Sequence, residues 1–170
     1  MRFGDIILMA CGSGDMMEKR RLHKTVYLLT LGSGLEGEFG AGYFGPYSRY
    51  VEYEFEKLAP HNFIREEVRP RGNGTVMRLL SLTEQGRAVL DGLIKKYPRE
   101  YEQIADMVVR INQLEDEELI KATKACMLLR VFFTDEVEEK ASRIGWNVSK
   151  EDVKEGLEKL ERIGFIWWIR

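Results

Sequence analysis

The sequence predicts a mainly helical fold of the α+β class with one small antiparallel hairpin. Apolar residues recur at helical spacing through most of the 170 residues, which is typical of amphipathic helices. Two extended apolar segments, at 63–69 and 75–82, are joined by Pro70-Arg71-Gly72-Asn73-Gly74, in which Asn-Gly accepts the positive φ angles of a tight turn. We therefore expect helices on both sides of a single hairpin.

Two helices are expected before the hairpin region. The first spans residues 3–11 and is closed by Gly12-Ser13-Gly14. The second is expected to start at Asp15, because Asp15 and Glu18 have the spacing of a capping box, and to stop at Gly32-Ser33-Gly34. Its apolar residues would face the core. Its opposite face would carry the basic residues Lys19, Arg20, Arg21 and Lys24.

The next elements complete a recognisable order. A glycine-interrupted extended stretch at 39–44 leads to a third helix at about 48–58, and a further helix at 82–97 follows the hairpin. Helix, helix, helix, hairpin, helix is the order of a winged helix, in which the hairpin is the wing. We predict a winged-helix-like module over residues 1–97.

A helical lobe is predicted over residues 98–170. Its expected elements are helices at 100–112, 116–133, 135–144 and 149–163 and a terminal strand at 165–169. An internal similarity relates this lobe to the module: Glu56-Lys57-Leu58 and Asn62-Phe63-Ile64 match Glu158-Lys159-Leu160 and Gly164-Phe165-Ile166. The lobe is either a second, wingless copy of one helix-to-strand unit, or both segments follow the common order helix, glycine, strand.

Composition favours a cytoplasmic protein. The hydrophobic content of 44% is enough to build a core without disulfides, and Cys11 and Cys126 lie in apolar stretches that suit buried thiols. The longest apolar runs, 6–11 and 26–31, are far shorter than the ~20 residues of a membrane-spanning helix. No secretory signal precedes them.

Motifs for catalysis or cofactor binding do not fit their required context. Gly32-Ser33-Gly34-Leu35-Glu36-Gly37 has the dinucleotide-binding spacing, but it follows an expected helix, whereas that site follows a strand. The two histidines, His23 and His61, have no Cys, His or carboxylate at a metal-ligand spacing. We therefore predict a protein that is not an enzyme, with no catalytic residues, metal, cofactor or small-molecule substrate.

The first hypothesis for the partner is DNA, with a role in transcription regulation. Winged helices hold phosphates with the wing and with helix ends, and the candidate nucleic-acid-binding residues are Lys19, Arg20, Arg21, Lys24, Arg49, Arg69 and Arg71. Charge gives this hypothesis limited support, because residues 1–97 carry a net +2 and residues 98–170 a net −4. Glu52 and Glu56 on the third helix would repel phosphate.

The second hypothesis is a protein-binding adaptor whose partner is another protein or a second copy of the chain. Tyr43, Phe44, Tyr47, Tyr50 and Tyr53 cluster within eleven residues. Trp167 and Trp168 would point to opposite faces of the terminal strand, so at least one ring needs cover beyond a single core. The candidate partner-binding residues are Tyr50, Tyr53, Trp167 and Trp168.

Three motifs carry a family resemblance: Arg21-Leu22-His23-Lys24-Thr25-Val26-Tyr27-Leu28-Leu29, Tyr43-Phe44-Gly45-Pro46-Tyr47-Ser48 and Leu82-Thr83-Glu84-Gln85-Gly86. Over about residues 15 to 95 the chain resembles the YwgA-like proteins of bacteria and archaea. More distantly it is similar to the Panacea domain of SocA-like antitoxins, which bind and neutralise or deliver partner proteins, although the usual Trp after the tyrosine helix is missing. The resemblance implies a winged-helix-like core, antitoxin-like protein binding as one role, and no catalytic residues.

Overall fold

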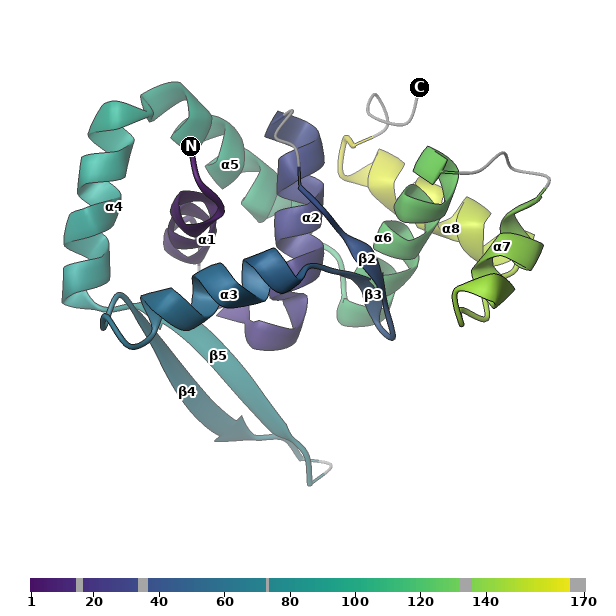
Figure 1. Ribbon diagram of the computed structural model, residues 1–170, viewed down its shortest axis with the longest axis horizontal. Coiled ribbons are helices and arrows are strands. Elements are labelled where there is room, and N and C mark those ends of the chain that lie inside the picture. Colours follow the sequence, from purple (N-terminus) through teal and green to yellow (C-terminus); the bar gives the residue numbers. More distant parts are fainter. Residues whose placement is uncertain (15–16, 34–36, 73, 132–135, 166–170) are drawn as a thin grey trace.

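The computed structural model describes residues 1–14, 17–33, 37–72, 74–131 and 136–165. Within these ranges the chain is mainly helical and contains a small antiparallel sheet, as the sequence predicts (Figure 1). No helix in the described ranges is both long enough and apolar enough to span a lipid bilayer.

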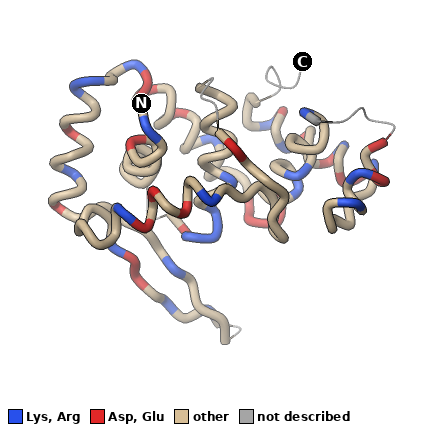
Figure 2. Tube along the Cα trace, in the orientation of Figure 1, with Lys and Arg blue, Asp and Glu red and all other residues tan. Residues whose placement is uncertain are grey.

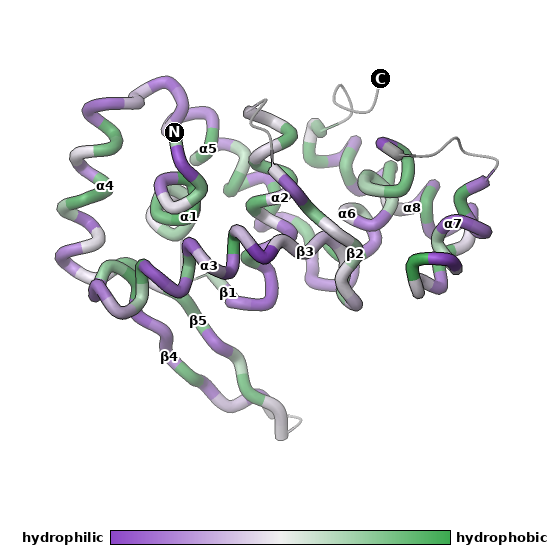
Figure 3. Tube along the Cα trace, in the orientation of Figure 1, coloured by the Kyte–Doolittle hydropathy of each residue, from purple (hydrophilic) through white to green (hydrophobic). Residues whose placement is uncertain are grey.

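The first part of the chain has the topology of a winged helix. The sheet has the order β1-β5-β4 with antiparallel pairing, and β4 and β5 form the wing (Figure 1). The elements of this part are α1 (Phe3–Gly12), β1 (Met17–Glu18), a 3-10 turn (Lys19–Arg21), α2 (Leu22–Ser33), α3 (Arg49–Leu58), β4 (Ile64–Pro70) and β5 (Val76–Leu82). The helix α1 is apolar along most of its length and packs against α2, α3, β5 and two later helices, which places it in the core of the module (Figure 3).

The start of the second helix differs from the prediction. Glu18 lies in β1, and α2 begins only at Leu22 after the 3-10 turn, so Glu18 does not complete a capping box; Asp15 lies outside the described residues. The reason is a pairing that local spacing does not reveal. Met17 pairs with Leu80 of β5 and is buried, so the sheet and the core stabilise extended backbone at this point.

A second, two-stranded hairpin separates α2 from α3. It consists of β2 (Gly40–Gly42) and β3 (Gly45–Tyr47). The strand β3 packs against α2, and β2 pairs with β3. Ser48 then caps α3, because its Oγ accepts a hydrogen bond from the Val51 amide at 3.4 Å. The third helix therefore occurs where the sequence predicts it, but the stretch predicted as extended over 39–44 folds back on itself at Tyr43 and Phe44, and Gly45-Pro46 lies in β3. The expectation of a single hairpin was wrong, because the antiparallel pairing of these two short strands is not evident from their glycine-rich sequence.

The helix after the wing also begins as predicted. In α4 (Glu84–Lys96) the Thr83 hydroxyl accepts a hydrogen bond from the Gly86 amide at 3.0 Å. A Cβ atom added to Gly86 would lie 2.0 Å from the Phe63 carbonyl oxygen, so only glycine permits this approach between α4 and the start of the wing.

The remaining helices are α5 (Pro98–Ile111), α6 (Asp116–Val131), α7 (Val137–Arg143) and α8 (Lys150–Arg162). The boundary predicted between 97 and 98 separates α4 from α5, and the main core continues across it, because buried residues of α5, α6 and α8 belong to the same cluster as those of α1 and α2. A smaller cluster, which includes Leu128, Val137 and Trp146, joins α6, α7 and α8.

The internal similarity corresponds to a shared helix ending. After α3, Asn62 has a φ of 56° and the Phe63 amide donates to the Leu58 carbonyl at 3.1 Å. After α8, Gly164 has a φ of 77° and the Phe165 amide donates to the Leu160 carbonyl at 2.8 Å. The two segments therefore stop their helices in the same way. The predicted terminal strand falls almost entirely on residues 166–170, which lie outside the described ranges.

Candidate interaction surfaces

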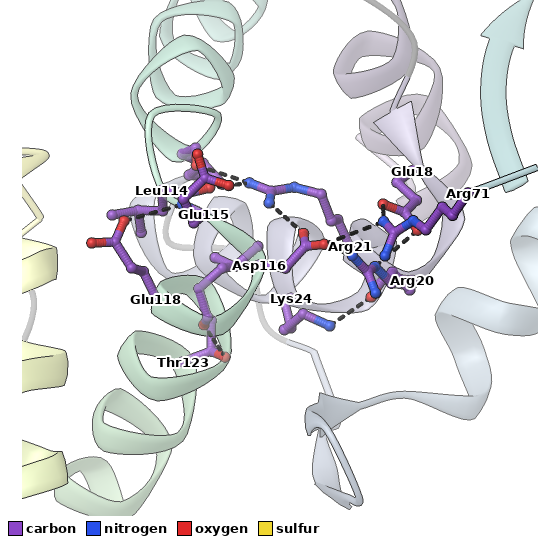
Figure 4. A network of polar contacts seen from close by, with 12 residues as sticks. Glu18, Arg20, Arg21, Lys24, Arg71, Leu114, Glu115, Asp116, Glu118 and Thr123 are labelled. Carbon is purple, nitrogen blue, oxygen red and sulfur yellow. Dashed lines mark hydrogen bonds and ion pairs between the residues drawn. The ribbon is translucent and has the colours of Figure 1, made fainter. Parts of the chain in front are cut away.

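Three of the predicted nucleic-acid-binding residues meet in a network of ion pairs (Figure 4). Arg20 contacts Glu18, with Nε 2.8 Å from Oε1, and also contacts Asp116 at the start of α6. Arg71, from the wing, lies 2.7 Å from Glu18 and 3.7 Å from Asp116. Arg21 Nη1 lies 2.6 Å from Asp116 Oδ1. We call Glu18, Arg20, Arg21, Arg71 and Asp116 the ionic hub; it joins β1, the 3-10 turn, the wing and α6.

Arg21 and Lys24 do not form the solvent-facing basic surface that the sequence predicts. Arg21 points between the helices of the second half, where its Nη2 donates hydrogen bonds to the carbonyls of Ile111 at 3.2 Å and Leu114 at 2.9 Å. Lys24 is only 5% exposed, and its Nζ donates to the Arg20 carbonyl at 2.5 Å. Helical spacing placed these residues away from α1, but α6 and β3 cover that side of α2.

The other predicted basic residues lie near carboxylates or apart from the hub. Lys19 Nζ is 3.4 Å from Glu66 Oε2. The other oxygen of this carboxylate, Oε1, contacts Arg78 of the wing. Arg69 Nε is 2.6 Å from Glu67 Oε1 on the same strand. Arg49 is exposed at the start of α3. In Figure 2, acidic and basic residues are interspersed along α3 and the wing rather than separated by sign.

The acidic partners in these pairs were missed from the sequence. Asp116 is the first residue of α6, where a negative charge interacts favourably with the helix dipole. Its pairing with Arg21 spans 95 positions, so no local spacing could indicate it. The contacts of Glu18 and Glu66 with their basic partners likewise depend on the pairing of β1 and β4 with β5, which links residues far apart in the sequence.

A cleft of about 490 Å³ lies between the wing, the 3-10 turn and α3. Its charged lining includes the cations Lys19, Arg20, Arg71 and Arg78 and the carboxylates Glu18 and Glu52. Cations therefore outnumber carboxylates among the residues that line it. This excess is the feature of the structure that best fits a polyanion.

His23 connects this cleft to α3. Its Nδ1 accepts a hydrogen bond from the Ser48 amide at 3.3 Å, and its Nε2 lies 2.9 Å from Glu52 Oε2, which assigns the ring proton to Nε2. Burial lowers the pKa of His23 despite the neighbouring Glu52 carboxylate, so the neutral ring is favoured. The ring of Tyr47 lies 4.5 Å from the His23 ring. His23 therefore fixes the start of α3 and supports an exposed tyrosine.

Five aromatic side chains are exposed on the β2–β3 hairpin and on the outer side of α3. These are Tyr43, Phe44, Tyr47, Tyr50 and Tyr53, and we call them the aromatic surface. Their exposed fractions lie between 41% and 83%. The hairpin and α3 follow one another across the molecule (Figure 1). The helix is amphipathic, with Val51 and Phe55 facing the core, so its tyrosines face solvent as a consequence of the helical repeat.

The aromatic surface stands on well-fixed supports. The ring of Tyr50 packs edge-on against Phe3 at 5.3 Å, and Lys57 Nζ lies 3.8 Å from the centre of the Tyr53 ring. Trp146, which the sequence had not indicated, donates its indole N–H to the Gly42 carbonyl at 2.7 Å and so attaches the hairpin to the α7–α8 connection. Of the predicted partner-binding residues, Tyr50 and Tyr53 lie on this surface. Trp167 and Trp168 lie outside the described residues.

Two further findings bear on the chemistry of the chain. The Gly32–Gly37 motif begins in the last turn of α2 and is followed by β2, an order opposite to that of a dinucleotide site; residues 34–36 of the motif lie outside the described ranges. Among the described residues, no group of three or more His, Cys, Asp or Glu side chains is placed to hold a metal ion. Comparison with known proteins adds no assignment, because no protein-family profile and no curated protein matches the chain.

Proposed function

We propose that this protein is a non-enzymatic adaptor that binds a partner protein through the aromatic surface. The observation that carries the proposal is the exposure of all five aromatic side chains on two consecutive elements. Tyrosine and phenylalanine bury large areas at interfaces and are frequent hot spots of binding. Large exposed apolar areas are rare on monomers and mark interaction sites.

The rigidity of the surface supports the same function. The Ser48 cap and the two hydrogen bonds of His23 fix the first turn of α3, and Trp146 holds the hairpin. Tyrosine has few rotatable bonds, so a partner would order little additional side-chain motion on binding. The rim contains Arg49 and Lys57 as well as Glu52 and Glu56, which suits a partner with an apolar centre and a mixed-charge border.

DNA binding is the second candidate, and the cationic lining of the cleft favours it. The contacts around the cleft weaken it. Arg20 and Arg71 share the carboxylates of Glu18 and Asp116, so a phosphate would have to displace existing ion pairs. The outer side of α3, which would enter the major groove in a winged helix, contains Glu52 and Glu56. We therefore rank the protein partner first.

Photocrosslinking tests the proposed surface. The photoreactive residue p-benzoylphenylalanine would replace Tyr53, and in a matched control it would replace Val109, which is 55% exposed on α5. The partner captured at position 53 would then be purified and titrated. We expect Tyr50→Ala and Tyr53→Ala each to weaken its affinity by about 2 kcal/mol, or roughly 30-fold, as at a typical hot spot. Val109→Ala should leave the affinity unchanged. Equal losses in all three variants would contradict the proposal.

A parallel titration addresses DNA. Fluorescence anisotropy of a labelled mixed-sequence duplex would be recorded at low and near-physiological salt. The Arg49→Ala, Arg69→Ala double variant would serve as the test, since it removes exposed cations without entering the ionic hub. Two results together would reverse the ranking. DNA binding would fall steeply with salt and weaken in this double variant, and the protein partner would bind the Tyr53→Ala variant as tightly as the wild type.

A further inference from the structure

Lys24 is a buried cation that the proposed function does not use. It lies in α2, is 5% exposed, and the hydrogen bond that its Nζ donates goes to the Arg20 carbonyl of its own turn. No carboxylate within ion-pair distance of Nζ is found among the described residues. The side chain is enclosed by the hairpin, because a Cβ added at Gly45 would lie 3.7 Å from two of its methylene carbons. A lysine in this position lacks the counter-ion that normally justifies burial.

A small cavity adjoins this side chain. It has a volume of about 110 Å³ and is lined by Arg20, Lys24, Phe44, Asp116 and Ile120. Phe44 and Ile120 provide apolar walls, and Arg20 and Asp116 provide the charged part of the lining. The space is large enough for a few small atoms beside the amine but too small for a cofactor.

Burial and the neighbouring arginines favour the uncharged form of Lys24, whereas the nearby carboxylate of Glu18 opposes it. Arg20 and Arg21 belong to the same segment, His23 is its neighbour on α2, Glu18 faces it from β1 and Asp116 from α6. Burial, followed by the repulsion from Arg21 and Arg20, lowers the pKa of Lys24 to about 8. At pH 7.4 such an amine is neutral in about one-fifth of molecules, against roughly one in a thousand for an ordinary lysine.

From the cavity, the burial and the missing counter-ion, we propose that Lys24 is a carbamylation site that takes up carbon dioxide. The lone pair of the neutral ε-amine attacks the carbon of CO2, a nitrogen–carbon bond forms, and the electron pair of one C=O bond moves to oxygen. The nitrogen then releases one proton to solvent. The product is an N-carboxylate of charge −1, and the step needs no oxidant, reductant or other reactant.

The product would suit its surroundings better than the ammonium does. Arg20, Arg21 and Arg71 lie in the adjoining hub with Glu18 and Asp116, and Glu115 adds a further negative charge near Arg21, so a carbamate would replace the positive charge of Lys24 next to these arginines by a negative one. The carbamate would share the cavity with Arg20, whose guanidinium now contacts Asp116. Carbamylation would therefore compete with Asp116 for Arg20 and loosen the link between the 3-10 turn and α6 when CO2 is abundant.

Carbon-13 NMR in ¹³C-labelled bicarbonate buffer at pH 8 detects the carbamate directly. Four proteins would be compared: wild type, Lys24→Met, Lys24→Arg and, as the matched control, Lys95→Met, which removes an exposed lysine of α4. Lys24→Met tests a neutral chain of similar length and Lys24→Arg a cation that cannot form a carbamate. Near-UV circular dichroism would confirm that each is folded.

All four proteins should share the carbamate resonance of the N-terminal amine, and we expect a further carbamate resonance in the wild type and in Lys95→Met that is missing from both Lys24 variants. Trapping the wild-type carbamate by O-ethylation and mapping peptides by mass spectrometry gives the site without a variant, and the modified peptide should contain Lys24. Identical spectra for all four proteins, or trapped carbamate only at other amines, would overturn the proposal.

Discussion

The ionic hub makes a quantitative prediction about stability, centred on Asp116. This carboxylate contacts Arg20 and Arg21 and lies 3.7 Å from Arg71, and it is the only hub residue contributed by α6. Asp116→Asn keeps the size of the side chain and one acceptor oxygen but removes the charge. Arg21 would then remain largely buried with only neutral acceptors, namely the asparagine oxygen and the backbone carbonyls of Ile111 and Leu114.

The size of the effect follows from the exposure of the two arginines. The contact with Arg21 is a charge-assisted hydrogen bond to a side chain only 12% exposed, and such bonds contribute about 1.5–3 kcal/mol. Arg20 is half-exposed, so solvent screening reduces its contribution to below about 1 kcal/mol. Because asparagine retains an acceptor, we expect a loss of about 2 kcal/mol in the free energy of unfolding, or about 4–8 °C in Tm for a chain of this length.

Urea unfolding followed by circular dichroism measures this loss. The matched control is Glu117→Gln, which removes the charge of the next residue in the first turn of α6, where the side chain is exposed. Both variants lose a favourable interaction with the helix N-terminus, so their difference isolates the hub. The midpoint should fall in Asp116→Asn at an unchanged slope. If the two variants are equally stable within about 0.5 kcal/mol, the hub does not stabilise the fold as described.

Three further changes probe other contacts. Gly156→Ala should destabilise the protein by about 1–3 kcal/mol in urea unfolding, because the new Cβ would lie 2.7 Å from a carbonyl oxygen of α6. The control Gly92→Ala, where the new Cβ has nothing within 4 Å, should stabilise the protein by about 0.5–1 kcal/mol. The reverse order of stabilities would refute the α6–α8 packing. Trp146→Phe removes the N–H donated to Gly42 and should accelerate amide exchange in β2 and β3 while the α1 core stays protected. Hydrogen bonds from Arg162 and Lys159 hold the pKa of Glu118 at about 2, so its stabilising effect is present above the unfolded pKa and is lost as pH falls towards 2; wild type and Glu118→Gln should differ at pH 6 and converge near pH 2 in thermal unfolding.

Elements set by local chemistry could be predicted from the sequence. Ser48 and Thr83 cap α3 and α4 at the predicted starts, and Asn62 and Gly164 end the two similar helices. Each of these signals acts within four or five residues, so the spacing of residue types contains the information. The exposure of Tyr50 and Tyr53 follows from the same local logic, since Val51 and Phe55 occupy the inward face of α3.

Contacts between distant residues could not be predicted in this way. The pairing of Met17 with Leu80 turned an expected helix start into a strand, and the pairing of Arg21 with Asp116 turned an expected surface cation into an internal one. Lys24 shows the same limit, because only α6 and β3, which cover that side of α2, determine that it is buried. A cluster of basic residues in a sequence thus indicates a nucleic-acid surface only when the fold leaves it without carboxylate partners.

The hub and the aromatic surface have related roles in this fold. In a winged helix that reads DNA, the wing needs free cations, and its position adjusts to the duplex. Here Arg71, in the turn between β4 and β5, ties the wing to Glu18 and Asp116, so the wing is joined to β1 and α6 through its own cation. The charges that would serve phosphate instead hold the two halves of the chain together, while α3 and the β2–β3 hairpin keep their tyrosines exposed. This division of tasks is the physical reason to look for a protein partner on α3 before a nucleic acid on the wing.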